Sequence, residues 1–177
     1  MSQPRRSDAT ERWLQNDSLF FEQVEAGHRW ALHLGALLLS RGLVVYVTPP
    51  TFREKVEDRE KWKDENDLWA AKRRGRPVLL EVKSRSLPFS TPESYPYPTA
   101  YVCSARKWKL KERRPLATCL VSQATGAVLC IPTESSSTWQ EQGTCDSVRG
   151  ITYPVYTAPK EELRDFDWLC EKIAENS

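Results

Sequence analysis

The chain has 177 residues and a formal net charge of +2. This length fits one globular domain and is ample for a hydrophobic core, so we expect residues 1–177 to form a single domain. A net charge so close to zero does not by itself indicate a nucleic-acid-binding protein, but the charge is unevenly distributed. Residues 58–67 are rich in acids, whereas residues 72–76 and 106–114 are strongly basic, so any phosphate contact depends on these local patches.

The composition also limits the cellular context that we expect. The apolar run over residues 31–39 is too short to cross a membrane, and the N-terminal segment lacks the apolar core of a signal peptide. The five cysteines are odd in number and widely spaced, which favours reduced thiols over disulfides. Because no Cys-x-x-Cys pair is present and His28 and His33 point in different directions on a helix, we expect no structural zinc site. We therefore expect a soluble cytoplasmic protein without membrane contact.

The predicted elements begin with two helices. Residues 8–16 predict a short helix and residues 20–40 a long one, which Gly42 ends. The compact apolar run at residues 43–47 predicts a strand, and prolines follow it closely. Residues 52–65 are charged, and their pattern leaves helix and loop open. A helix followed directly by a strand is the first step of a mixed sheet.

The next segment, from Asp67 to Lys83, predicts a β-hairpin. Two strand-like runs flank a polar turn, and we expect a three-residue loop that ends at Gly75 with a positive φ. With that loop, Asp67 falls directly opposite Glu81 on the neighbouring strand. Because side chains alternate between the two faces of a strand, Lys83 shares the face of both acids. The hairpin therefore brings two carboxylates and one ammonium group together.

This grouping of charges has two interpretations. Like charges directly opposite each other destabilise a strand pair, and a divalent cation between them reverses that effect. Magnesium prefers hard oxygen ligands and keeps several waters, so two carboxylates leave room for a phosphate and its attacking water. The alternative is the charged outer face of a half-exposed strand. The run before Glu81, residues 78–80, is apolar on both faces, as in a strand near the centre of a sheet.

The remaining elements are shorter. The proline-rich residues 87–99 predict an extended loop, and Ser104 is expected to cap a short basic helix that ends at Arg114. Residues 116–122 and 127–131 predict a second hairpin.

The C-terminal part, residues 133–177, predicts a long loop and then a helix. The loop covers residues 134–150, and the helix begins at about Lys160 with its apolar residues on one side. Of the tryptophans, Trp69 lies on the Asp67 face, whereas Trp108 and Trp139 are open to either core packing or base stacking.

The order of these elements resembles the PD-(D/E)XK nuclease superfamily. Residues 18–132 carry the resemblance: a long helix, a strand, a strand that bears Asp, a strand that bears Glu-x-Lys, a basic helix and a strand. It implies an α/β fold with a restriction-endonuclease-like αβββαβ core, whose mixed central sheet is flanked by helices, with residues 133–177 added to it. The sequence has Asn66-Asp67 in place of the family's Pro-Asp, which keeps the ligand. Residues 122–126 and 146–149 are also similar to segments of small nucleases of phages and mobile elements.

The resemblance implies a role for each residue of the hairpin motif. Asp67 and Glu81 would hold magnesium, for which manganese can substitute, and the Val82 carbonyl would be a third ligand. Lys83 would orient or deprotonate the attacking water. Many members add a glutamate from the first helix, for which Glu25 is the candidate together with Glu22, although both precede the family's usual position near residue 31.

Four basic residues are candidates for DNA binding: Arg85, Lys107, Lys109 and Lys111. Arg85 lies on the strand face of Lys83, and Lys107 and Lys111 would share one face of the basic helix. The alternative is an ordinary solvated helix face.

We therefore expect a magnesium-dependent DNA endonuclease, with DNA as its partner and a homodimer as one arrangement for cutting both strands. A second interpretation is a catalytically inactive module that binds nucleic acid on the same fold. A third is an RNase, or a nuclease subunit that needs a partner.

Overall fold

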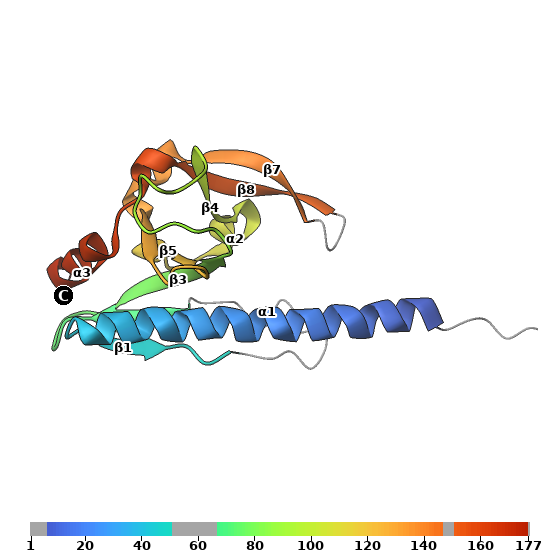
Figure 1. The fold of residues 1–177 in the computed structure, drawn as a ribbon, viewed down its shortest axis with the longest axis horizontal. Coiled ribbons are helices and arrows are strands. Elements are labelled where there is room, and N and C mark those ends of the chain that lie inside the picture. Colours follow the sequence, from blue (N-terminus) through green and yellow to red (C-terminus); the bar gives the residue numbers. More distant parts are fainter. Residues whose placement is uncertain (1–6, 51–66, 147–150, 177) are drawn as a thin grey trace, which may run out of the picture.

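The computed structural model describes residues 7–50, 67–146 and 151–176. It has a mixed α/β fold with a five-stranded mixed sheet, a three-stranded antiparallel sheet and few helices, which confirms the expected α/β class (Figure 1). The elements in chain order are α1 (Ser7–Ser40), β1 (Val44–Val47), β2 (Leu68–Ala71), β3 (Val78–Arg85), β4 (Thr99–Ser104), α2 (Ala105–Leu110), β5 (Ala117–Ser122), β6 (Val128–Pro132), η2 (Thr133–Thr138), β7 (Gln140–Asp146), β8 (Ile151–Pro159), η3 (Lys160–Glu162) and α3 (Phe166–Glu175). The expectation for residues 52–65 lies outside the described residues.

The first helix is continuous, so the expected break after residue 16 is wrong. Asp and Ser inside a helix cost at most about 0.7 kcal/mol each relative to Ala, so Asp17 and Ser18 need not interrupt it. The expected end of the helix is confirmed. Gly42 has a φ of 78° and its N–H donates to the Leu39 carbonyl at 2.9 Å, while the Leu43 N–H donates to the Leu38 carbonyl at 3.2 Å. These two bonds satisfy carbonyls that the helix end leaves without partners.

The large sheet has the strand order β1-β2-β3-β5-β6. The pairs β1–β2, β2–β3 and β5–β6 are antiparallel, whereas β3 and β5 are parallel. A parallel pair needs a crossover connection, and here the chain between β3 and β5 includes β4 and α2. The sequence between β3 and β5 thus lies on one side of the sheet, where it contributes to the site described below.

The register of the β2–β3 hairpin is the expected one, because Leu68 pairs with Leu80 and Trp69 with Leu79. The turn differs in detail. The residue with positive φ is Arg74, at 68°, and not Gly75 as expected. The Gly75 N–H donates to the carbonyl of residue 72 at 2.8 Å, so the turn closes there and its left-handed position falls one residue earlier.

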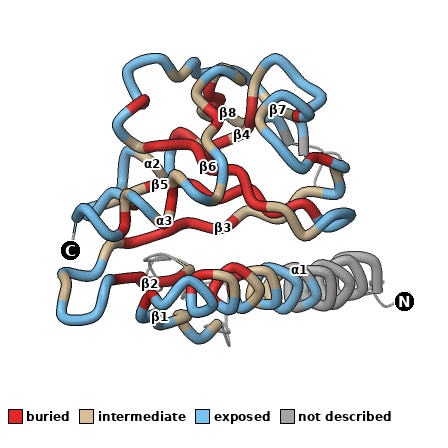
Figure 2. The backbone as a smooth tube through the Cα atoms, turned by 60° about the vertical axis from the view of Figure 1, so that its left-hand side comes forward, coloured by how far each residue is buried: buried red, intermediate tan, exposed pale blue. Residues whose placement is uncertain are grey.

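Each face of the large sheet has its own core. On one face, Leu80 and Val82 of β3 pack with Leu34 and Leu38 of α1 and with Leu169 of α3. On the other face, a second core joins β5 and β6 to the small sheet and to the loop before β4. Figure 2 shows the buried backbone of β3 between α1 and the small sheet. Glu81, which alternates with Leu80 and Val82, therefore projects toward the side of the small sheet.

The small sheet, with the order β4-β8-β7, was not expected from the sequence. The expected long loop is wrong for residues 134–146, because η2 and β7 occupy them and β7 pairs with β8 along its whole length; residues 147–150 lie outside the described residues. The β7 sequence is polar and has no alternation of apolar residues, so its strand depends on its partner. The last helix begins at Phe166 and not at Lys160, because Asp165 caps it by accepting from the Trp168 N–H at 2.9 Å.

Two expectations from composition concern the whole chain. The five cysteines are all free, as expected. Cys119 and Cys130 are buried neighbours on β5 and β6, and their sulfurs are 3.8 Å apart. Within the described ranges, no helix is both long enough and apolar enough to span a membrane.

Candidate active site

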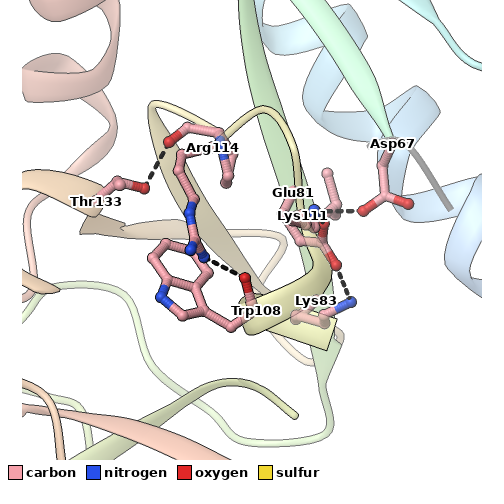
Figure 3. Close-up of polar contacts among 9 residues, drawn as sticks. Asp67, Glu81, Lys83, Trp108, Lys111, Arg114 and Thr133 are labelled. Carbon is pink, nitrogen blue, oxygen red and sulfur yellow. Dashed lines mark hydrogen bonds and ion pairs between the residues drawn. The ribbon is translucent and has the colours of Figure 1, made fainter. Parts of the chain in front are cut away.

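Glu81 is the centre of the candidate site. It lies in the middle of β3, and only 5% of its surface is exposed. Its carboxylate accepts from the Lys83 ammonium at 2.6 Å through one oxygen and from the Lys111 ammonium through the other. The two lysine side chains are 25% and 12% exposed, respectively. Figure 3 shows the three side chains directed toward one another.

The charge of Glu81 follows from these contacts. Burial by itself raises the pKa of a carboxyl group, because it penalises the charged form. Here the ammonium groups of Lys83 and Lys111 outweigh burial and lower the pKa of Glu81 to about 2. Glu81 is therefore a carboxylate at neutral pH although it is buried, which a metal ligand requires.

Asp67 lies beside Glu81, immediately before β2. Its N–H donates to the Leu80 carbonyl at 3.2 Å, and its side chain accepts from the Val82 N–H at 2.5 Å. In a regular continuation of the β2–β3 ladder, Asp67 would pair with Glu81. Its N–H instead bonds to the carbonyl of Leu80, one residue earlier on β3, so Asp67 is not a regular cross-strand partner of Glu81. The second bond fixes the carboxylate against the β3 backbone (Figure 3). The expected pairing of Asp67 directly opposite Glu81 is therefore not present as a regular strand pair, but the Asp67 carboxylate does contact the strand that carries Glu81 and Lys83.

Lys111 reaches Glu81 because of the turn that follows α2. Ser104 caps this helix as expected, since its hydroxyl accepts from the Lys107 N–H at 3.2 Å. The helix ends at Leu110 and not at Arg114. Lys111 already has extended backbone, with φ −69° and ψ 120°. The expected helical face shared by Lys107 and Lys111 is therefore wrong, because the chain leaves the helix before Lys111.

Trp108 anchors this turn. The Arg114 guanidinium lies 4.0 Å from the centre of the Trp108 ring and also donates to the Trp108 carbonyl. The rings of Trp108 and Trp139 are 4.7 Å apart between centroids. Trp139 in turn donates from its indole nitrogen to the Ser135 hydroxyl at 3.0 Å. Both tryptophans thus pack in the second core and hold the segment that carries Lys111.

The other basic candidates have different environments. Arg85 stacks on Tyr101, with its guanidinium 4.7 Å from the ring centre, and one of its amino nitrogens is buried without a hydrogen-bond partner among the described residues. Lys109 forms an exposed ion pair with Glu141 of β7 at 3.2 Å. Lys107 is exposed on α2. Of the four predicted DNA-binding residues, only Lys107 and Lys109 are exposed, and Lys111 belongs to the centre of the site.

Glu25 does not join the two carboxylates. It is exposed on α1, and α1 packs on the sheet face of Leu80 and Val82, opposite to the face of Glu81. Among residues 7–50, 67–146 and 151–176, no three His, Cys, Asp or Glu side chains come together in a way that could hold a metal ion. The described structure therefore does not place Glu25 with Asp67 and Glu81, and its role as a further ligand stays a prediction.

The donor set fits magnesium in its chemistry. It offers two carboxylates and main-chain carbonyls, and magnesium accepts few protein ligands because it keeps several waters. Both oxygens of Glu81 contact ammonium groups in this structure. Because like charges repel, we expect at least one of these ammonium groups to move away when a cation binds to Glu81.

The sequence matches no protein-family model, and no curated protein matches it.

Proposed function

We propose that the protein is a magnesium-dependent DNA endonuclease on a PD-(D/E)XK core, the αβββαβ arrangement of restriction endonucleases. One observation carries the proposal: the carboxylates of Asp67 and Glu81 lie with the ammonium groups of Lys83 and Lys111 around the middle of one buried strand. Buried charges are costly, and an arrangement that keeps a carboxylate ionised at such a place is typical of functional sites.

The order of the elements supports the same proposal. Helix α1 is followed by the antiparallel strands β1, β2 and β3, and β5 then pairs with β3 in parallel after α2. This agrees with the αβββαβ order that the sequence resemblance implies. In this interpretation β4 is inserted before α2, and β6 to α3 are additions to the core.

The proposed mechanism assigns each group of the site a task. Asp67, Glu81 and the Val82 carbonyl would hold the magnesium ion, with Asp67 fixed in place by the Val82 N–H. When bound, the ion supplies positive charge to the phosphate and makes a nearby water more acidic. Lys83 orients the water that attacks phosphorus, and Lys111 neutralises charge on the phosphate as the P–O bond breaks. Lys107 and Lys109 of α2 contact the DNA backbone from the exposed side.

The test is cleavage of supercoiled plasmid and of a labelled linear duplex with magnesium, manganese or EDTA. We expect cleavage with either metal and none with EDTA. We expect Lys83→Ala to cleave at least about 100-fold more slowly, as for the loss of a general acid–base group. Lys172→Ala is the matched control, because Lys172 lies on α3 and forms an ion pair with the exposed residue Glu175 at 2.8 Å. Nicked and linear products distinguish cutting of one strand from cutting of both.

A second candidate function is a nucleic-acid-binding module without catalysis. It is favoured by the ion pairs that occupy both oxygens of Glu81 and by the lack of a third acidic ligand within the described residues. Folded protein that binds DNA but leaves every substrate intact with both metals would contradict the endonuclease proposal and support this module. Cleavage assays on RNA substrates in parallel test whether the protein is an RNase. The molecular mass in solution shows whether the protein is a homodimer or a single chain, as expected for a subunit that needs a partner.

A further inference from the structure

A depression beside the candidate active site has no part in the mechanism above. It has a volume of about 420 Å³ and opens widely to solvent. Its lining includes Trp69 of β2, Leu79 of β3, and Arg113 and Arg114 of the segment that follows α2. The side chains of these residues carry an aromatic ring, an aliphatic group and two guanidinium groups.

Two of the residues that line the depression, Trp69 and Leu79, lie on the same face of the sheet as Glu81. Leu79 precedes Glu81 by two positions on β3, and Trp69 is the cross-strand partner of Leu79, so all three side chains share that face. Two positions along a strand correspond to about 6.6 Å. The depression is therefore the immediate neighbour of the candidate active site along β3.

An aromatic row extends from the depression toward the edge of the sheet. Tyr46 of the edge strand β1 pairs with Trp69, so its side chain lies on the same face. Tyr46 is 59% exposed, and Trp69 is half-buried. Helix α1 covers the opposite face of these strands. Aromatic surface thus remains available to solvent directly beside a group of buried charges.

The two arginines differ in how firmly they are held. The guanidinium of Arg114 is stacked on Trp108 and donates to its carbonyl, so its position is fixed. Arg113 is exposed beside it. Guanidinium groups bind phosphate through paired hydrogen bonds, and aromatic rings stack on any base. Together they match the phosphate and the base of one nucleotide.

We propose that this depression binds an unpaired nucleotide of the DNA strand, next to the phosphodiester bond that is cleaved. The inference rests on the proposed endonuclease function and specifies its substrate class. A base inside a duplex is stacked on both sides, so it presents its face to Trp69 only when it is unpaired or unstacked. The preferred substrate is therefore DNA with a single-stranded segment, such as a flap, an overhang or a frayed end.

The test measures binding in EDTA, where no metal-dependent cleavage interferes. Fluorescence anisotropy compares a short labelled oligodeoxynucleotide with a duplex of the same sequence. We expect tighter binding of the single strand, and roughly 5-fold or greater weakening by Trp69→Leu, which removes the stacking ring. Trp69→Phe, which keeps an aromatic face, should remain within about 3-fold of the unmodified protein.

Arg113→Gln provides a second variant, and because Arg113 is exposed we expect it to keep the fold. It should weaken single-strand binding by roughly 5-fold, since a charged hydrogen bond to phosphate is lost. The matched control is Arg29→Gln, an exposed arginine on α1, which covers the other face of the sheet. If Arg113→Gln binds the single strand as tightly as Arg29→Gln does, the proposal of a nucleotide site in this depression is wrong. Equal binding of single strand and duplex also overturns it.

Plasmid cleavage with magnesium separates this inference from the proposed function. If single-strand binding depends on Trp69 and Arg113 but no substrate is cut, the nucleotide site stands and the endonuclease proposal fails. If DNA is cut but neither variant alters single-strand binding, the endonuclease proposal stands and the nucleotide site fails.

Discussion

A carboxylate that lies between two ammonium groups, as Glu81 lies between Lys83 and Lys111, keeps its charge over the whole physiological pH range. The three side chains are mostly buried, so solvent screens their interaction only weakly. Removing one member leaves its partners with uncompensated charge, which is more costly than the loss of an exposed ion pair. The cluster therefore couples the fold of this region to the chemistry of the candidate site.

This coupling predicts a dependence of stability on pH. Burial opposes the ionised form of Glu81, but the two lysines lower its pKa from 4.5 to about 2. A group with a lowered pKa in the folded state stabilises the fold above its unfolded pKa and loses this contribution as the pH falls through the folded value. We therefore expect the free energy of unfolding to fall by an amount on the order of 3 kcal/mol between about pH 4.5 and about pH 2 because of Glu81.

Urea unfolding of Glu81→Gln across this pH range measures the effect. The difference in stability between the unmodified protein and Glu81→Gln should be largest at neutral pH and should shrink as the pH falls. Glu175→Gln is the control, because the Glu175 side chain is 62% exposed and its ion pair with Lys172 lies at the surface. The assigned charge state of Glu81 is wrong if the unmodified protein and Glu81→Gln differ in free energy of unfolding by the same amount at about pH 6 and at about pH 3.

The sequence predicts part of this cluster and misses the rest, for a physical reason. Asp67, Glu81 and Lys83 belong to one hairpin, where alternation and register are local properties that a sequence reveals. Lys111 is thirty residues from Glu81, and their contact depends on where a helix of six residues ends. Its only signal in the sequence is the basic run 106–114, which also fits a solvated helix face.

At the scale of elements, the segment from α2 to β5 determines the geometry of the site. The ring of Trp108, near the end of α2, contacts Trp139, which follows η2, and the guanidinium of Arg114, which precedes β5. Trp108 and Arg114 flank the turn that carries Lys111, so their contact fixes both ends of that turn. The sequence left the environment of Trp108 and Trp139 open, because their contact is tertiary. It also missed β4, β7 and β8, whose pairings join residues that are distant in the chain or polar in pattern.

Replacement of Trp108 tests the role of this segment. We expect Trp108→Ala to lower the free energy of unfolding by about 3 kcal/mol, the usual cost of removing a large packed ring. Trp108→Phe keeps part of the contact and should cost about half as much. Urea unfolding measures both. If Trp108→Ala is as stable as the unmodified protein, the ring does not anchor the turn.

At the scale of the whole molecule, the large sheet has one face that packs against helices and another that carries the candidate active site. One face packs on α1 and α3, and Arg41 at the end of α1 joins these helices through an ion pair with Asp167 at 2.7 Å. The other face carries the candidate active site and, farther along, the second core and the small sheet. The arrangement of the first three strands and the second hairpin was predictable because those contacts are close in sequence. The small sheet was not, because its strands are brought together by the rest of the fold.

We propose that Asp67 and Glu81 together hold a divalent cation at this face of the sheet. Electron paramagnetic resonance of manganese measures it directly, because bound and free manganese differ in signal. We expect manganese bound to the unmodified protein, with binding lost in both Asp67→Asn and Glu81→Gln and retained in Asp167→Asn, whose carboxylate is 66% exposed on α3. Equal manganese binding by all four proteins, or by none, would contradict the account.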